Sequence, residues 1–254
     1  MTKERLHPLG MTKVENTPAF LIHRRMYQGS SLLLDFFTKD FGRLRLIARG
    51  ARNSKTSLQM FQCLSISFKG RGDLKSLSQW EIADQPRRLQ GDDLILAMYA
   101  NELILRLVPE SDPNGNIFKS YWVLLENLLN LDSNEKEYAL RKFENQMLED
   151  LGYGLDFEHD INGDTISFDL YYEFIEHQGF ASNKNGVFLG ETLLKLAKDA
   201  RINLDSNELR ILKKMNRKRL KSLLGDKPLT VSYTHLRAHE TDSYLVCRLL
   251  LEKK

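Results

Sequence analysis

The sequence predicts an α+β fold in which a small antiparallel β-barrel precedes an α-helical domain. Between residues 17 and 82, short apolar runs alternate with turn residues, as antiparallel strands do. After Pro86 the apolar residues recur at three- and four-residue spacing, which indicates helices. The chain has 254 residues, 42% of them hydrophobic, and is therefore long enough to build a core in each region.

Five strands are expected in the first region, at residues 19–24, 31–38, 41–52, 62–69 and 73–82. Turn residues such as Gln28-Gly29-Ser30 and Gly70-Arg71-Gly72 separate them. Five short strands with a longer irregular gap between the third and the fourth fit the five-stranded barrel of the OB-fold.

Five helices are expected in the second region, at residues 92–108, 113–128, 135–151, 191–199 and 205–224. In the last of these, Asp205 precedes Glu208 by three residues, which is an acidic variant of the capping box. The helix is expected to end at Gly225.

The residues between these helices are less regular. Residues 155–188 are acidic, and a short hairpin is expected around residues 165–174 and 179–180. The expected domains are a flexible extension at 1–16, an OB-fold nucleic-acid-binding domain at 17–85 and a helical domain at 86–230. The change from strands to helices should fall near residues 83–90.

The net charge of +3 conceals an uneven distribution. Residues 1–90 carry a net charge of +9, residues 91–204 carry −12, residues 205–230 carry +5, and the last 24 residues carry +1. Such a distribution suits a protein that binds a polyanion through its basic part and contacts a different partner through another part.

Composition and motifs exclude several classes of protein. Two cysteines, Cys63 and Cys247, cannot form a disulfide scaffold or a four-cysteine zinc site. No apolar run approaches 18 residues and no signal peptide is evident, so a cytoplasmic protein without membrane contact is expected. No Walker lysine loop occurs, and His235 and His239 lack a third metal ligand nearby. We therefore expect no catalytic residue, cofactor or metal site, and no enzymatic activity.

The third expected strand carries arginines at a two-residue period. Arg43, Arg45 and Arg49 share one face, and apolar residues occupy the other. A two-residue step of roughly 6.6 Å is comparable to the phosphate spacing of an extended single strand, and the guanidinium fork suits phosphate oxygens. The basic residues expected to contact nucleic acid are Arg24, Arg25, Arg43, Arg45, Arg49, Arg52 and Lys55. The alternative is a solvated outer face of the barrel.

The last helix is the second basic element. It has seven cations and no acid in the twelve positions from Arg210 to Lys221. Four of the cations form a stripe at three- and four-residue spacing, namely Arg210, Lys214, Arg217 and Lys221. This stripe is expected to contact phosphates, with a solvated helix face as the alternative.

Several of these segments together resemble the RecO family, recombination mediators of the bacterial RecF pathway of DNA repair. The most specific is Gly42-Arg43-Leu44-Arg45-Leu46-Ile47-Ala48-Arg49-Gly50-Ala51-Arg52. The others are residues 20–25, 30–38, 70–77, 99–103, 140–144, 151–154 and 224–229. The resemblance is nearly continuous from about residue 17 to residue 229.

The resemblance implies an N-terminal OB domain and a helical C-terminal domain. It implies binding of single- and double-stranded DNA, DNA recombination by annealing of complementary strands, and help in loading RecA. The implied partners are RecR and the acidic C-terminal tail of single-stranded DNA-binding protein (SSB). The matching segment at 140–144 makes Arg141 and Lys142 candidates for the SSB tail, with an ordinary exposed pair on an amphipathic helix as the alternative.

The chain departs from the family pattern in two places. Many members carry a four-cysteine zinc site in the helical domain, which this sequence cannot build, so residues 155–188 must hold together without metal. Residues 231–254 bear no resemblance to the family and look like a translated sequencing adapter, so a non-native tail is expected there.

Three other functions fit parts of the pattern. The same basic barrel would serve an RNA-binding OB protein, and the acidic helical domain would serve a protein-interaction adaptor. A metal-dependent nuclease is the third alternative, although no motif supports it.

Overall fold

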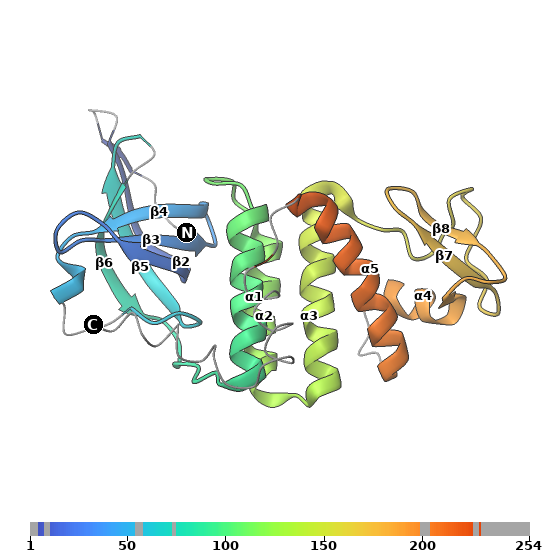
Figure 1. The fold of residues 1–254 in the computed structure, drawn as a ribbon. Coiled ribbons are helices and arrows are strands. Elements are labelled where there is room, and N and C mark those ends of the chain that lie inside the picture. The colour runs from blue at the N-terminus through green and yellow to red at the C-terminus, as the bar shows by residue number, and fades with distance from the viewer. Residues whose placement is uncertain are drawn as a thin grey trace. The chain divides into compact units, whose positions relative to one another are not determined.

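The computed structural model describes residues 5–7, 11–53, 58–72, 75–198, 204–225 and 229. These residues form two compact units, the first of which ends at Phe118 and the second of which begins at Lys119. The expected α+β class is confirmed (Figure 1).

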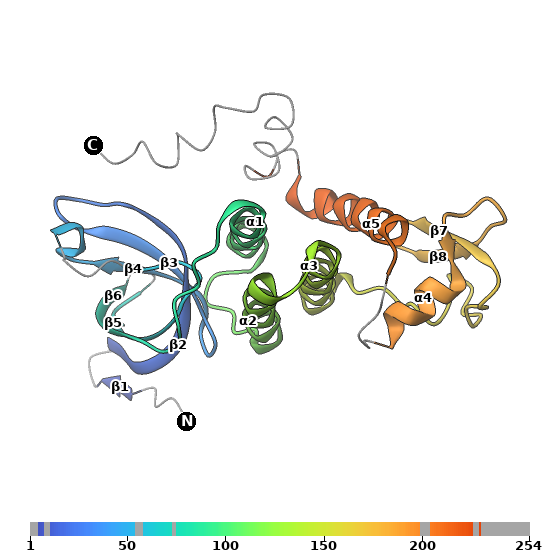
Figure 2. The same cartoon turned by 90° about the horizontal axis from the view of Figure 1, so that it is seen from below.

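The strands of the first unit form a closed barrel of the OB type. They are β1 (Arg5–His7), β2 (Met11–Met26), β3 (Leu32–Thr38), β4 (Gly42–Ala48), β5 (Cys63–Gly70) and β6 (Lys75–Ile82). The sheet order is β1-β2-β3-β4-β6-β5, and the additional pairing of β2 with β5 closes it. The antiparallel pairs are joined by one parallel pair, β4 with β6, at Leu46 and Lys75. Figure 2 shows the short β1 beside β2.

Two strands differ from their expected lengths. β2 begins at Met11 rather than at residue 19, because its polar first half pairs with β5, where Thr12 lies opposite Gly70. β4 ends at Ala48 rather than at residue 52. The chain turns at Gly50, whose φ of +70° favours glycine, and forms a short 3₁₀ helix, η1 (Ala51–Asn53).

β3 is buried on both of its faces. Leu34 and Phe36 belong to the core inside the barrel. Leu33, Asp35 and Phe37 point to the other face and are also buried. The ring of Phe118 covers Phe37 there, with the ring centroids 5.6 Å apart.

Two helices begin in this unit. α1 (Gly91–Leu107) packs against β2, and α2 (Gly115–Asn130) contributes Phe118. α1 thus belongs to the same compact unit as the barrel, although the change from strands to helices does fall where it was expected.

The second unit contains α3 (Ser133–Leu148), the π-helical turn η2 (Glu149–Tyr153), α4 (Gly190–Ala197) and α5 (Ser206–Leu224). α5 lies against α3 (Figures 1 and 2). The expected capping box of α5 is confirmed, since Asp205 accepts from the backbone amide of Glu208 and Glu208 accepts from that of Asp205.

The acidic segment of the second unit forms a small sheet. Its strands are β7 (Tyr171–Ile175), β8 (Gly179–Ser182) and β9 (Phe188–Leu189), in the order β8-β7-β9. The expected hairpin is therefore present at β7 and β8, but residues 165–170 are not part of a strand. Phe180 is fully buried, and its ring lies 5.5–5.9 Å from three other phenylalanine rings, those of Phe157, Phe174 and Phe188. Apolar packing thus holds this segment together.

The described residues contain neither a cluster of metal ligands nor a membrane-spanning helix. No group of three histidine, cysteine, aspartate or glutamate side chains there is arranged to hold a metal ion. None of the helices in that part of the chain is both long and apolar enough to span a membrane.

Candidate nucleic-acid interface

Four exposed arginines gather at one end of the barrel, where β2 and β4 finish. Arg24 and Arg25 end β2, Arg49 follows β4, and Arg52 lies in η1. The strand register brings these segments together, because Leu32 of β3 pairs with both Met26 and Ala48. We call Arg24, Arg25, Arg49 and Arg52 the barrel-end cluster.

A pair of hydrogen bonds joins the two segments of this cluster. The backbone amide of Arg52 donates to the carbonyl of Ser30 over 3.1 Å, and its Nη1 donates to the carbonyl of Gly29 over 2.8 Å. None of the four arginines forms an ion pair with another described residue, so their charges face solvent uncompensated at short range. Lys55, the remaining basic residue predicted for this loop, lies outside the described residues.

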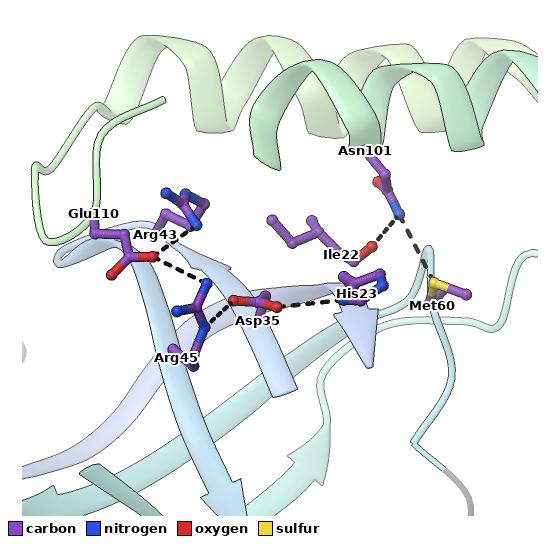
Figure 3. A network of polar contacts seen from close by, with 8 residues as sticks. All are labelled: Ile22, His23, Asp35, Arg43, Arg45, Met60, Asn101 and Glu110. Atoms are coloured by element: carbon purple, nitrogen blue, oxygen red, sulfur yellow. Dashed lines mark hydrogen bonds and ion pairs between the residues drawn. The ribbon is translucent and has the colours of Figure 1, made fainter. Parts of the chain in front are cut away.

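Arg43 and Arg45 are placed differently. Arg43 donates from Nε to the carbonyl of Val108 over 3.0 Å, and its side chain is only 12% exposed. Arg45 donates from Nε to Oδ1 of Asp35 over 2.9 Å. Both guanidinium groups also reach Oε1 of Glu110, at 3.1 Å and 3.2 Å (Figure 3). The two-residue period did place both arginines on one face of β4, but that face carries its own carboxylates.

Asp35 links three neighbouring strands. His23, Asp35 and Arg45 lie directly opposite one another in the register of β2, β3 and β4. Nδ1 of His23 lies 3.4 Å from Oδ2 of Asp35. Burial by itself would raise the pKa of the Asp35 carboxyl, but the hydrogen bonds and charges of His23 and Arg45 outweigh burial and lower this pKa below its ordinary value.

The Asp35→Asn variant is expected to lower the free energy of unfolding by about 1–3 kcal/mol at neutral pH, because Arg45 loses an ionised, buried acceptor. A carboxyl whose pKa is lowered by folding stabilises the protein above its unfolded pKa of about 3.9, and this contribution is lost as the pH falls through the folded pKa. The difference between wild type and variant should therefore shrink below about pH 4. Urea denaturation at several pH values measures it, and a difference that stays constant down to pH 3 would contradict this account.

Asn101 of α1 was not singled out in the sequence, although it fastens that helix to the barrel. Its buried side-chain amide donates to the carbonyl of Ile22 in β2 over 3.1 Å and lies 3.9 Å from the sulfur of Met60 (Figure 3). Ile22 precedes His23, where the pairing of β2 with β3 shifts register. The sequence did contain a signal for this contact, because Asn101 is a polar residue in a helix that is apolar on almost every side.

α5 presents the second cationic surface. The four cations predicted for the stripe are exposed, namely Arg210, Lys214, Arg217 and Lys221. The other three cations of the helix are paired or buried. Lys213 pairs with Glu137 at 3.2 Å, the exposed Lys218 pairs with Glu176 at 3.4 Å, and Arg219 is buried. We call Arg210, Lys214, Arg217 and Lys221 the α5 stripe.

Buried polar contacts hold α5 against α3. Asn216 donates to Glu144 over 3.0 Å, and Arg219 donates to the side chain of Asn145 over 3.0 Å and to the carbonyl of Tyr153 over 2.6 Å. Burial lowers the pKa of Arg219 to about 10, against the opposing charge of Glu144. Arg219 thus positions the stripe and does not belong to it.

The two residues considered for the SSB tail have different surroundings. Arg141 is only 3% exposed, and its Nη1 lies 3.0 Å from Glu144, which is fully buried. Lys142 is exposed on the outer side of α3. The expectation that both residues present their charge to a partner is therefore wrong for Arg141, whereas Lys142 remains a prediction.

The fold places the chain in the class of OB-barrel proteins with an appended helical domain. Two family models match it, Recombination protein O N terminal over residues 11–86 and Recombination protein O C terminal over residues 88–229. The chain belongs to the RecO family of DNA repair proteins.

Similar proteins agree with this assignment. DNA repair protein RecO of Coxiella burnetii (strain RSA 493 / Nine Mile phase I) is 38% identical over 230 residues, covering 86% of this chain and 97% of the relative. DNA repair protein RecO of Idiomarina loihiensis (strain ATCC BAA-735 / DSM 15497 / L2-TR) is 40% identical over 222 residues, covering 83% of this chain and 93% of the relative. The family match ends at residue 229, and the predicted non-native tail at 231–254 lies outside the described residues.

Proposed function

We propose that this protein binds single- and double-stranded DNA through the barrel-end cluster and the α5 stripe, and anneals complementary strands. With RecR it would help to load RecA on DNA coated with SSB, at the bacterial nucleoid. One observation supports DNA binding most directly. The cations of the barrel-end cluster and of the α5 stripe are exposed and form no ion pair with the described acidic residues.

The proposed mechanism needs no bond to be made or broken. Lysine and arginine neutralise backbone phosphates and release their counterions, so binding is largely independent of sequence. Two strands that repel each other in solution can then be held by the same protein molecule. Lys142 would contribute to binding of the acidic SSB tail.

Strand annealing on SSB-coated DNA tests this function. Complementary labelled oligonucleotides are coated with SSB and mixed with the protein, and duplex formation is followed by fluorescence transfer. We expect faster annealing that weakens steeply as salt is raised. Annealing that is no faster with the protein present would contradict the proposal, and preferential competition by an RNA oligonucleotide would favour the RNA-binding alternative.

The Lys214→Glu/Arg217→Glu/Lys221→Glu variant is expected to slow annealing by about tenfold, because three phosphate contacts on one strand become repulsive. These side chains are exposed, so the melting temperature should change little. The matched control reverses three exposed lysines elsewhere in the second unit, Lys119, Lys184 and Lys198. Equal slowing by both variants would show that the effect comes from net charge and not from the α5 stripe.

A further inference from the structure

One carboxylate oxygen lies between two guanidinium groups on the face of β4. Oε1 of Glu110 is 3.1 Å from Nη1 of Arg43 and 3.2 Å from Nη2 of Arg45 (Figure 3). Two guanidinium groups that converge on a single anionic oxygen have the geometry of a phosphate clamp. The occupant of this clamp is a side chain of the protein itself.

The backbone around Glu110 is held independently of its carboxylate. The amide of Ser111 donates to the carbonyl of Arg43 over 2.9 Å, and the carbonyl of Val108 accepts from Nε of Arg43 over 3.0 Å. The backbone of Asp112 packs so closely against Gly42 that a Cβ there would lie 2.1 Å from its carbonyl oxygen. The Glu110 side chain is 45% exposed, so it can rotate into solvent while the loop stays in place.

We propose that Arg43 and Arg45 form a phosphate subsite for the DNA backbone, which Glu110 fills when DNA is absent and leaves when DNA binds. This inference rests on the DNA binding proposed above, and it identifies Glu110 as a side chain that competes with DNA for the two arginines. A phosphodiester carries one negative charge, as the Glu110 carboxylate does, so the exchange preserves the charge balance of the cluster. Asp35 keeps its contact with Nε of Arg45 at 2.9 Å and holds that guanidinium in position during the exchange.

The subsite continues the barrel-end cluster along β4. Arg49 lies in the turn after β4, four residues beyond Arg45, so the two are separated by up to roughly 13 Å, or two phosphate steps of an extended strand. A single strand that starts at Arg49 and follows β4 would therefore reach Arg45, whose side chain is 34% exposed.

The Glu110→Gln variant tests this exchange. Its DNA affinity should rise by about three- to tenfold, because the phosphate no longer displaces a carboxylate. Its salt slope should steepen by about 0.7, the value for one single-strand phosphate, because in wild type that phosphate only replaces the Glu110 carboxylate and in the variant it replaces bound counterions. The charge-matched control is Glu81→Gln, since Glu81 of β6 is exposed and forms no ion pair with the described residues. Fluorescence anisotropy of a labelled oligothymidine at several salt concentrations gives both quantities.

A second variant separates the clamp from a change in net charge. In Arg45→Lys/Glu110→Gln the gain in DNA affinity should disappear. A lysine has a single nitrogen, so it cannot contact Asp35 with one nitrogen and a phosphate with another, as the guanidinium group can. Thermal melting confirms that each variant is folded. Equal gains in Glu110→Gln and Glu81→Gln, with wild-type binding intact, would overturn the phosphate subsite and leave the proposed function standing. Failure of the folded wild type to bind DNA would overturn both.

Discussion

The Arg24→Glu/Arg25→Glu/Arg49→Glu variant is expected to bind single-stranded DNA about 100-fold more weakly than wild type, or worse, at roughly 0.1 M salt. Three exposed cations that form no ion pair within the described part of the chain become three repulsive charges at the point where β2 and β4 finish. About 2.8 kcal/mol corresponds to this factor, which is a modest loss for three phosphate contacts. The salt dependence of binding should also flatten, because fewer counterions are released. Anisotropy titrations at several salt concentrations measure both changes.

The control for this variant reverses three exposed cations elsewhere in the first unit, namely Lys39, Arg71 and Arg88. It changes the net charge by the same amount and should weaken binding by less than about tenfold, through long-range repulsion alone. A result in which the two variants bind DNA equally would remove the barrel-end cluster as a specific interface.

The Glu144→Ala variant is expected to lower the free energy of unfolding by about 3–5 kcal/mol, because it leaves the buried Arg141 guanidinium with only the longer contact to Glu137, at 3.8 Å. Arg141 and Glu144 are 3% and 0% exposed and lie 3.0 Å apart. Urea denaturation measures this loss of stability. Glu149→Ala removes an exposed carboxylate close by and should change stability by no more than about 0.5 kcal/mol.

The double variant Arg141→Leu/Glu144→Leu should recover most of the stability lost in Glu144→Ala. Apolar side chains avoid the cost of removing two charges from water, and such replacements of buried ion pairs are often neutral or stabilising. If the double variant is instead as unstable as Glu144→Ala, the contacts of Glu144 beyond this ion pair, such as the one with Asn216, must dominate.

The periodicity of the sequence predicted which face of an element each side chain occupies. Along β4, Arg43 and Arg45 lie on one face and Leu44 and Leu46 on the other, as their alternation indicated. The α5 stripe was predicted equally well, because charged residues at three- and four-residue spacing must share one side of a helix.

Periodicity cannot show what covers a face. Glu110 is 65 residues beyond Arg45 in the sequence, and nothing local to β4 indicates that its arginines meet a carboxylate there. The first half of β2 was missed for a related reason, since residues 11–16 are mostly polar and the pairing of Thr12, Lys13 and Val14 with β5 is not visible in the local sequence. For Arg141 a signal did exist, because Glu144 follows it by three residues and so lies on the same side of α3.

The burial of β3 on both faces bears on how the first unit unfolds. β3 packs on both of its faces, against the barrel core on one side and, through Phe37, against Phe118 on the other. Detaching α1 would break the buried amide contact of Asn101 with β2, and displacing Phe118 of α2 would uncover the ring of Phe37. Separate opening of the helix is therefore costly, and the barrel and α1 should lose their hydrogen-exchange protection together as one cooperative unit.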